Sequence, residues 1–260
     1  MCPNKIVGLT KNLRVLSILG IVCSVIFVIL NILTRILGNK PDFVGIPLSA
    51  LAFGQYGWLG SLCFVMLAIT LFVFTLAISI TLPRGRLYKT ILVIFFIVSV
   101  CFFMAAFIKT DINHETWSVH RIIHEIIVFA GAGLFTIGCF IFSADIKRDK
   151  QWGSLFGFTL TSACIDLFVT GSRMYVLTYW PLLGLEELLL LSIGLIWMTV
   201  ISFKNLKISG GRTSSSPPGH PPKSASWPNR LPQCFLYLPV LFEFDKSSVS
   251  SKLPSGLNLL

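Results

Sequence analysis

Residues 15–33, VLSILGIVCSVIFVILNIL, decide the fold class of this chain. The run carries no charge and, as a helix rising about 1.5 Å per residue, nearly crosses a hydrocarbon core of roughly 30 Å. Basic residues precede it, as in a signal peptide: Lys5, Lys11 and Arg14. However, the run exceeds the roughly 7–15 residues of a signal core, and no small-residue cleavage site follows it. We therefore expect a retained transmembrane helix.

Five further apolar runs follow, at residues 58–82, 91–108, 122–142, 152–170 and 182–203. None alternates apolar and polar residues with a period of two, which disfavours a β-barrel. Backbone groups in lipid must be hydrogen-bonded within each segment, which leaves helices. The sequence predicts an all-α bundle of six transmembrane helices over residues 1–208. A Pro- and Ser-rich tail over residues 209–260 is expected to be cytoplasmic and mostly disordered.

The composition excludes several other classes of protein. Of the 260 residues, 54% are hydrophobic and only 12% are charged. A soluble domain carries about twice that charged fraction. The 7 cysteines are an odd number in a long apolar chain, which argues against a disulfide-stapled secreted module. The net charge of +10 is spread over loop ends, so it predicts the lipid bilayer as partner and no nucleic acid.

The distribution of Lys and Arg predicts the orientation. The segments expected inside carry 12 of these residues, three in each segment, and those expected outside carry 5. Because basic residues favour the cytoplasmic side of short loops, we expect both termini in the cytoplasm. The expected location of the protein is the plasma membrane. The longest connection between helices, residues 34–57, then lies outside. Pro47 and Ser49 favour a short helix there that caps the bundle, and the alternative is a lid over an outer cavity.

Ionisable residues gather toward the predicted outer face. Asp166 lies within a span, about 6 Å below its expected outer end. His124 lies in the first turn of another, and Glu186 opens the last one. The candidates for binding a ligand or proton are Asp111, His124, Asp166, Arg173 and Glu186. Because ionisable groups in lipid are costly, such residues commonly face a cavity or a partner.

Three kinds of chemistry fit these residues. His120 and His124 are spaced i, i+4 and would share a helix face, which suits a divalent metal such as zinc. The candidate metal ligands are His114, His120, His124 and Asp166. The same histidines would suit a proton relay, because imidazole titrates near neutral pH; bis-His haem ligation would need facing helices. The alternative is a purely structural set of helix caps and pairs.

Residues 41–65, PDFVGIPLSALAFGQYGWLGSLCFV, carry a family resemblance. With a His early in the fourth span, Gly184-Leu185-Glu186-Glu187 and Trp197, the chain resembles a six-helix membrane family known as domain of unknown function 998. The resemblance covers residues 12–207. Ala50 stands where members often have Asp, which puts a charged role for that position in doubt. The resemblance implies a fold and a membrane location and supplies no activity.

A second likeness is to membrane hydrolases such as the alkaline ceramidases, which use Ser, Asp and three His around zinc. This chain has histidines and Asp166 but six predicted helices instead of seven. The sequence thus favours a membrane protein that binds or transports a small solute or ion at the outer cluster. A zinc-dependent hydrolase and a non-catalytic scaffold are the alternatives.

Overall fold

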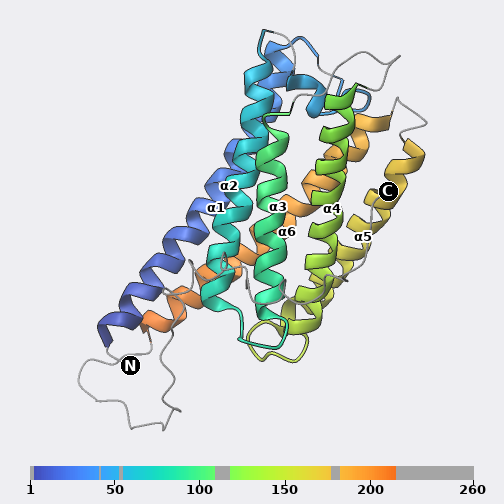
Figure 1. Ribbon diagram of the computed structural model, residues 1–260. Helices are drawn as coiled ribbons and strands as arrows, with labels where there is room; N and C mark the ends of the chain where they lie inside the picture. Colours follow the sequence, from blue (N-terminus) through green and yellow to red (C-terminus); the bar gives the residue numbers. More distant parts are fainter. Residues whose placement is uncertain (1–2, 41, 53–54, 109–117, 177–181, 215–260) are drawn as a thin grey trace, which may run out of the picture. The chain divides into compact units, whose positions relative to one another are not determined.

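The chain is described by a computed structural model over residues 3–40, 42–52, 55–108, 118–176 and 182–214. For residues 3–10, 173–176 and 211–214 it describes the backbone alone. Within these residues it is all-helical, with six long apolar helices that confirm the predicted spans (Figure 1). Their bounds are α1 Pro3–Leu37, α2 Gly57–Thr81, α3 Tyr88–Ala105, α4 Val119–Ile146, α5 Phe156–Val176 and α6 Leu183–Ser214. The predicted tail beyond Ser214 lies outside the described residues.

Local sequence signals set several helix ends. Asn39, two residues after the end of α1, takes a left-handed backbone conformation with φ of 51°, the arrangement that commonly ends helices. Leu82 is extended because it precedes Pro83, and this ends α2. Ser118 caps α4 by accepting the backbone N–H of Arg121 at 3.2 Å. Two 3₁₀ turns complete the connections, η1 Ser49–Ala52 and η2 Gly153–Leu155.

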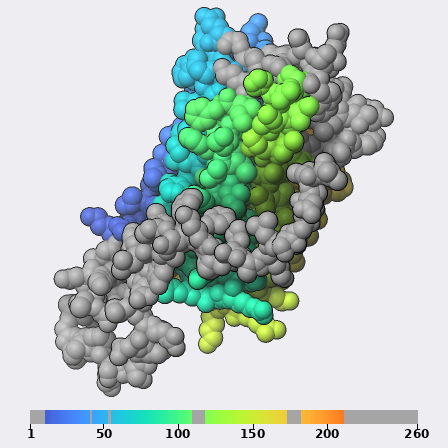
Figure 2. Space-filling view, viewed as in Figure 1, coloured from blue at the N-terminus to red at the C-terminus, as the bar shows by residue number. Residues whose placement is uncertain are grey.

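The helices form a closed ring in which each packs on its neighbours in sequence and α1 returns to α6. α3 and α4 lie side by side on the face shown in Figure 2. Gly131 and Gly138 allow this approach, since a Cβ at Gly138 would lie 3.0 Å from Ile94. α2 also touches α6 across the ring. In the apolar span of α2, 61% of the residues are buried, compared with only 28% in the span that contains α5. The span of α5 is therefore the least buried of the six.

The bundle has two ends, which are called the Arg35 end and the Trp152 end below. At the Arg35 end, α1, α3 and α5 finish and α2, α4 and α6 begin. At the opposite, Trp152 end, the turns α2–α3 and α4–α5 lie (Figure 1). The length and composition of the helices show that the chain is a multi-pass membrane protein.

Candidate functional site

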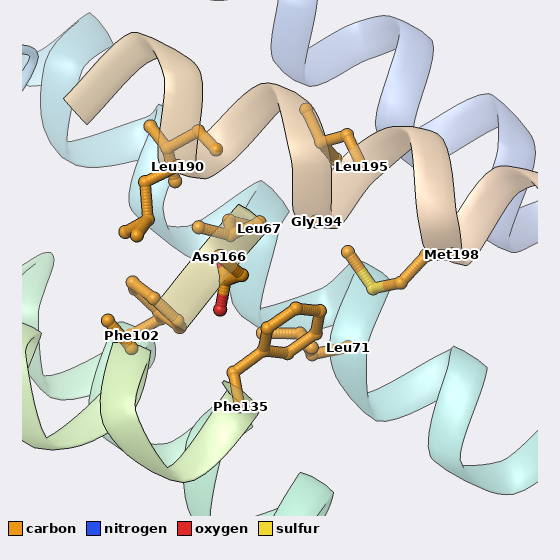
Figure 3. A pocket seen from close by; sticks show the side chains of 11 residues that line it. Leu67, Leu71, Phe102, Phe135, Asp166, Leu190, Gly194, Leu195 and Met198 are labelled. Carbon is orange, nitrogen blue, oxygen red and sulfur yellow. The ribbon is translucent and has the colours of Figure 1, made fainter. Parts of the chain in front are cut away.

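Asp166 is the buried carboxylate at the middle of α5. It is 2% exposed and hydrogen-bonds the Thr136 hydroxyl of α4 through Oδ2. Its other oxygen, Oδ1, has no hydrogen-bond partner among the described residues. The carboxyl group faces a cavity of about 30 Å³ between α2, α3, α4 and α6 (Figure 3). The side chains around it are otherwise apolar: Leu67, Leu71, Phe102, Ala132, Phe135, Leu190, Leu191, Leu195 and Met198.

Asp166 lies farther from the end of its helix than the sequence predicted. α5 continues to Val176, so ten residues, or about 15 Å, separate Asp166 from the end of the helix instead of the expected 6 Å. The difference arises because the helix runs on through Gly171, Ser172 and Arg173, where the apolar run has already stopped. A buried carboxylate within a membrane span is costly unless it is protonated or paired.

His124 occupies a different level from Asp166. It is 2% exposed and packs edge-on against Phe64 of α2, with ring centroids 5.9 Å apart. Its Nδ1 lies 2.6 Å from the carbonyl oxygen of Ile108, and since a carbonyl only accepts, Nδ1 carries the hydrogen. Thr136, the partner of Asp166, is twelve residues further along α4, which corresponds to about 18 Å. The two strongest sequence candidates therefore belong to separate layers.

Glu186, in the first turn of α6, and the adjoining Glu187 are both buried at the Arg35 end. Glu187 accepts the backbone N–H of Leu48 at 2.7 Å through Oε2. Carboxylates at this position also benefit from the helix dipole. Glu187 thus holds the connection between α1 and α2 against α6.

Arg35 holds the same connection from the other side. Its guanidinium is 1% exposed and donates to the carbonyl oxygens of Asp42 at 2.8 Å and Ile46 at 3.0 Å. It also donates to Asn31 Oδ1 at 3.1 Å and lies over the Phe43 ring. The connection between these anchors, residues 42–52, is called the strap below. Leu48 and Leu51 of the strap are buried in the core.

The strap ends in η1, which confirms the predicted short helix capping the bundle, although the helix is a single 3₁₀ turn. It is fixed by backbone approach as well as by charge. A Cβ at Gly184 would lie 2.7 Å from the Ile46 carbonyl oxygen, and one at Gly60 would lie 2.9 Å from the Ala52 nitrogen. The alternative of an outer lid stays a prediction, because the structure describes the strap in one closed position.

The remaining sequence candidates are only partly described. Asp111 and His114 lie outside the described residues, and Arg173 is described in its α5 backbone alone. His120 is exposed in the first turn of α4, whereas His124 is buried. In the described part of the chain, no group of three or more His, Cys, Asp or Glu side chains could hold a metal ion. The zinc site, which rests partly on His114, stays a prediction.

Three buried polar side chains of the site were not predicted from the sequence. Arg35 was counted as a loop charge, but it is helical and buried, and its i, i+4 spacing from Asn31 was the available signal. Arg121 is 3% exposed at the start of α4. Thr136 gave no signal, because its role comes from a contact with a residue 30 positions away.

One comparison with known proteins finds a family. A family model described as protein of unknown function, DUF998, matches residues 21–204. No curated protein and no solved structure matches the chain. The match covers every part of the site described above, from Arg35 to Met198.

Proposed function

We propose, on the premise that this chain belongs to the DUF998 family of proteins of unknown function, that this membrane protein binds a proton at Asp166. The observation that carries the proposal is the half-satisfied carboxyl group that faces a cavity within a span. Intramembrane ionisable residues that face cavities are typical of proton and ion pathways.

The size of the cavity limits the ligand. Its volume of about 30 Å³ is close to that of one or two water molecules. A solute of several heavy atoms does not fit without movement of the helices. The cavity therefore favours a monatomic ion, a water molecule or a proton.

The chemistry of the lining favours the proton among these. A hard metal cation takes about six or more oxygen ligands. Asp166 and Thr136 together offer three oxygen atoms, and the other lining side chains are apolar. A proton needs no coordination shell, and it removes the charge that makes a buried carboxylate costly.

The contacts of the Thr136 hydroxyl are compatible with a protonated carboxyl. Thr136 Oγ1 lies 3.0 Å from the carbonyl oxygen of Ala132 and also within hydrogen-bonding distance of Asp166 Oδ2. A hydroxyl has one hydrogen, so it cannot donate fully to both acceptors. Both contacts are satisfied when Asp166 carries a proton and donates it to Thr136 Oγ1, while Thr136 donates to Ala132.

A hydrophobic carbodiimide tests the proposal, because it reacts with protonated carboxyl groups in apolar surroundings. We expect dicyclohexylcarbodiimide to modify Asp166 in the full-length protein, with more modification as the pH falls, measured by peptide mass spectrometry. Asp149, which accepts backbone N–H groups at the Trp152 end, serves as the internal control and should stay unmodified.

Two variants sharpen this experiment. Asp166→Asn must remove the modification, and Thr136→Val should increase it at a given pH. The reason is that the ionised carboxylate loses a charge-assisted hydrogen bond, which is worth more than the neutral one. Absence of modification at Asp166 at every pH, in a protein that remains folded, would overturn proton binding and favour the non-catalytic scaffold.

We further propose that the Trp152 end faces the cytoplasm of a plasma-membrane protein, with both termini inside. The support is the excess of Lys and Arg at this end, where Arg84, Arg86 and Lys89 are all exposed. Reporter domains fused after Lys89 and after Lys150 should both be read on the cytoplasmic side. A periplasmic or extracellular signal from either fusion contradicts the orientation.

A further inference from the structure

We infer that protons reach Asp166 from the Arg35 end of the bundle, along the face of α5 that carries Thr170, and not from the Trp152 end. The inference rests on the proposed function, since it assigns a route to the same proton. Three features of the described residues carry it: a polar face on α5, an aromatic layer on one side of the cavity, and a thin apolar layer on the other.

The inner face of α5 is polar along much of its length. Thr159, Ser162, Asp166 and Thr170 are spaced by three or four residues, so they share one face of the helix, and all four are buried. Buried polar residues on a membrane helix serve either helix packing or a pathway. The two roles are distinguished by whether the hydroxyl groups of Thr159 and Thr170 have hydrogen-bond partners.

Toward the Trp152 end, the polar face is closed. The Thr159 hydroxyl accepts the indole N–H of Trp197 at 3.2 Å. The Trp197 ring lies with its centroid 5.1–5.7 Å from those of four phenylalanines: Phe74, Phe95, Phe135 and Phe142. Phe135 also lines the cavity, and Phe142 packs on Trp152. An aromatic layer built from α2, α3, α4 and α6 therefore forms the floor of the cavity.

Toward the Arg35 end, the polar face of α5 carries a hydroxyl group that can still accept or donate a hydrogen bond. Thr170 lies one turn, about 6 Å, beyond Asp166. It is 6% exposed, and its Oγ1 has no hydrogen-bond partner among the described residues. The apolar cover here is a small cluster separate from the main core: Ala132, Val169 and Leu190, with Ile193 beside it. A hydroxyl in this position can relay a proton between Asp166 and a transient water molecule.

The titratable groups around Asp166 fit this direction. From α4, the Cys139 thiol faces it, and from α2, α3 and α6 the lining side chains are apolar. Beyond the thin layer, Glu187 lies seven residues, about 10 Å, before Gly194 of the cavity wall, and Glu186 adjoins it. On α4, His124 lies about 12 Å before Ala132. On α6 the ionisable group nearest to Gly194 is therefore on the Arg35 side, since Lys204 lies ten residues, about 15 Å, beyond Gly194 on the other side. On α4 the order is reversed, because Asp145 lies about 14 Å from Thr136 and His124 about 18 Å.

The test uses full-length protein in sealed lipid vesicles, with the pH set separately on each side. Single cysteines introduced as Lys40→Cys and Arg86→Cys, each probed with an impermeant thiol reagent and peptide mass spectrometry, identify which end faces the bath. Modification of Asp166 by the permeant carbodiimide then reports the pH that this residue experiences. We expect the rate to rise when the Lys40 side is acidified and to stay constant when the Arg86 side is acidified.

A matched pair of variants tests the route. Thr170→Val keeps the shape and removes the hydroxyl, and we expect the response to a pH jump on the Lys40 side to slow about fivefold. Ser162→Ala, on the same face but toward the Trp152 end, should respond like the wild type. A rate that follows the pH on the Arg86 side, or on both sides equally, overturns the inference, as does an unchanged response in Thr170→Val. Failure of proton binding itself looks different, because Asp166 is then unmodified under every condition.

Discussion

The two ends of the bundle treat charge in opposite ways. At the Arg35 end, ionisable side chains are buried: Arg35, Arg121, His124, Glu186 and Glu187. Among the described side chains of the Trp152 end, the buried polar ones are neutral, as in the bond from Thr81 Oγ1 to Asn205 Oδ1 at 2.8 Å. The basic residues of this end are exposed or half-buried, among them Lys147 and Lys150.

This difference separates two roles of charge: orienting the protein in the membrane and stabilising its fold. An exposed lysine near a head group costs little and orients the chain. A buried guanidinium or carboxylate is tolerated only where its hydrogen bonds are satisfied. The Arg35 end concentrates this second kind of charge around the strap, and it is also the end from which we infer that Asp166 is reached.

The largest effect is expected at Arg35. Arg35→Ala removes the donors of two strap carbonyl groups and leaves the buried Glu187 without its neighbouring positive charge. Breaking a buried charged network in this way costs about 3–5 kcal/mol in the free energy of unfolding. Unfolding in mixed detergent micelles measures it.

The matched control is Arg86→Ala at the Trp152 end, which removes an exposed charge and should leave stability nearly unchanged. Arg35→Lys should restore little, because an ammonium group lacks the planar fork that bridges Asn31 and the strap. Equal stability of Arg35→Ala and Arg86→Ala would remove the distinction between the two ends.

A smaller effect is expected where the strap meets α6. In Gly184→Ala the new Cβ would lie 2.7 Å from the Ile46 carbonyl oxygen and 2.8 Å from that of Phe43, so the strap has to shift. Overpacking of this kind costs about 1–3 kcal/mol. The control is Gly171→Ala in α5, where nothing lies within 4 Å of the new Cβ and alanine favours the helix.

Thermal unfolding of both variants, with carbodiimide modification of Asp166 as a second readout, separates two outcomes. Lower stability of Gly184→Ala alone agrees with a strap seated on α6. Similar stability of Gly184→Ala and Gly171→Ala would mean that the strap tolerates displacement, and this result would support the lid that the sequence left as an alternative.

The sequence predicted the six spans because a membrane leaves few choices for an apolar run of about 20 residues. It also predicted the cap, from Pro47 and Ser49. The distance from Asp166 to the end of its helix was underestimated because α5 extends past the last apolar residue of its run. Helix length in a bundle depends on packing as well as on hydropathy.

The candidate site was harder to predict, because its geometry comes from contacts between distant parts of the chain. His124 and Asp166 were grouped by predicted height, yet Thr136, which contacts Asp166, lies about 18 Å along α4 from His124. Arg35 acts on the strap through backbone carbonyl groups, which no pattern of side chains reveals. Its burial becomes visible only when α1, α6 and the strap are seen together.

The smallest effect is expected in the neutral polar pair of the Trp152 end. Thr81→Val removes the hydrogen bond to Asn205 and should cost about 1 kcal/mol, a usual value for a neutral hydrogen bond. The cost stays small because Trp152 donates to the backbone carbonyl of Thr81 at 3.2 Å, which valine retains. Thr90→Val, at an exposed position of α3, is the control. Thermal unfolding of the three proteins measures the difference, and a loss in Thr81→Val as large as that in Arg35→Ala would show that both ends depend equally on their buried polar groups.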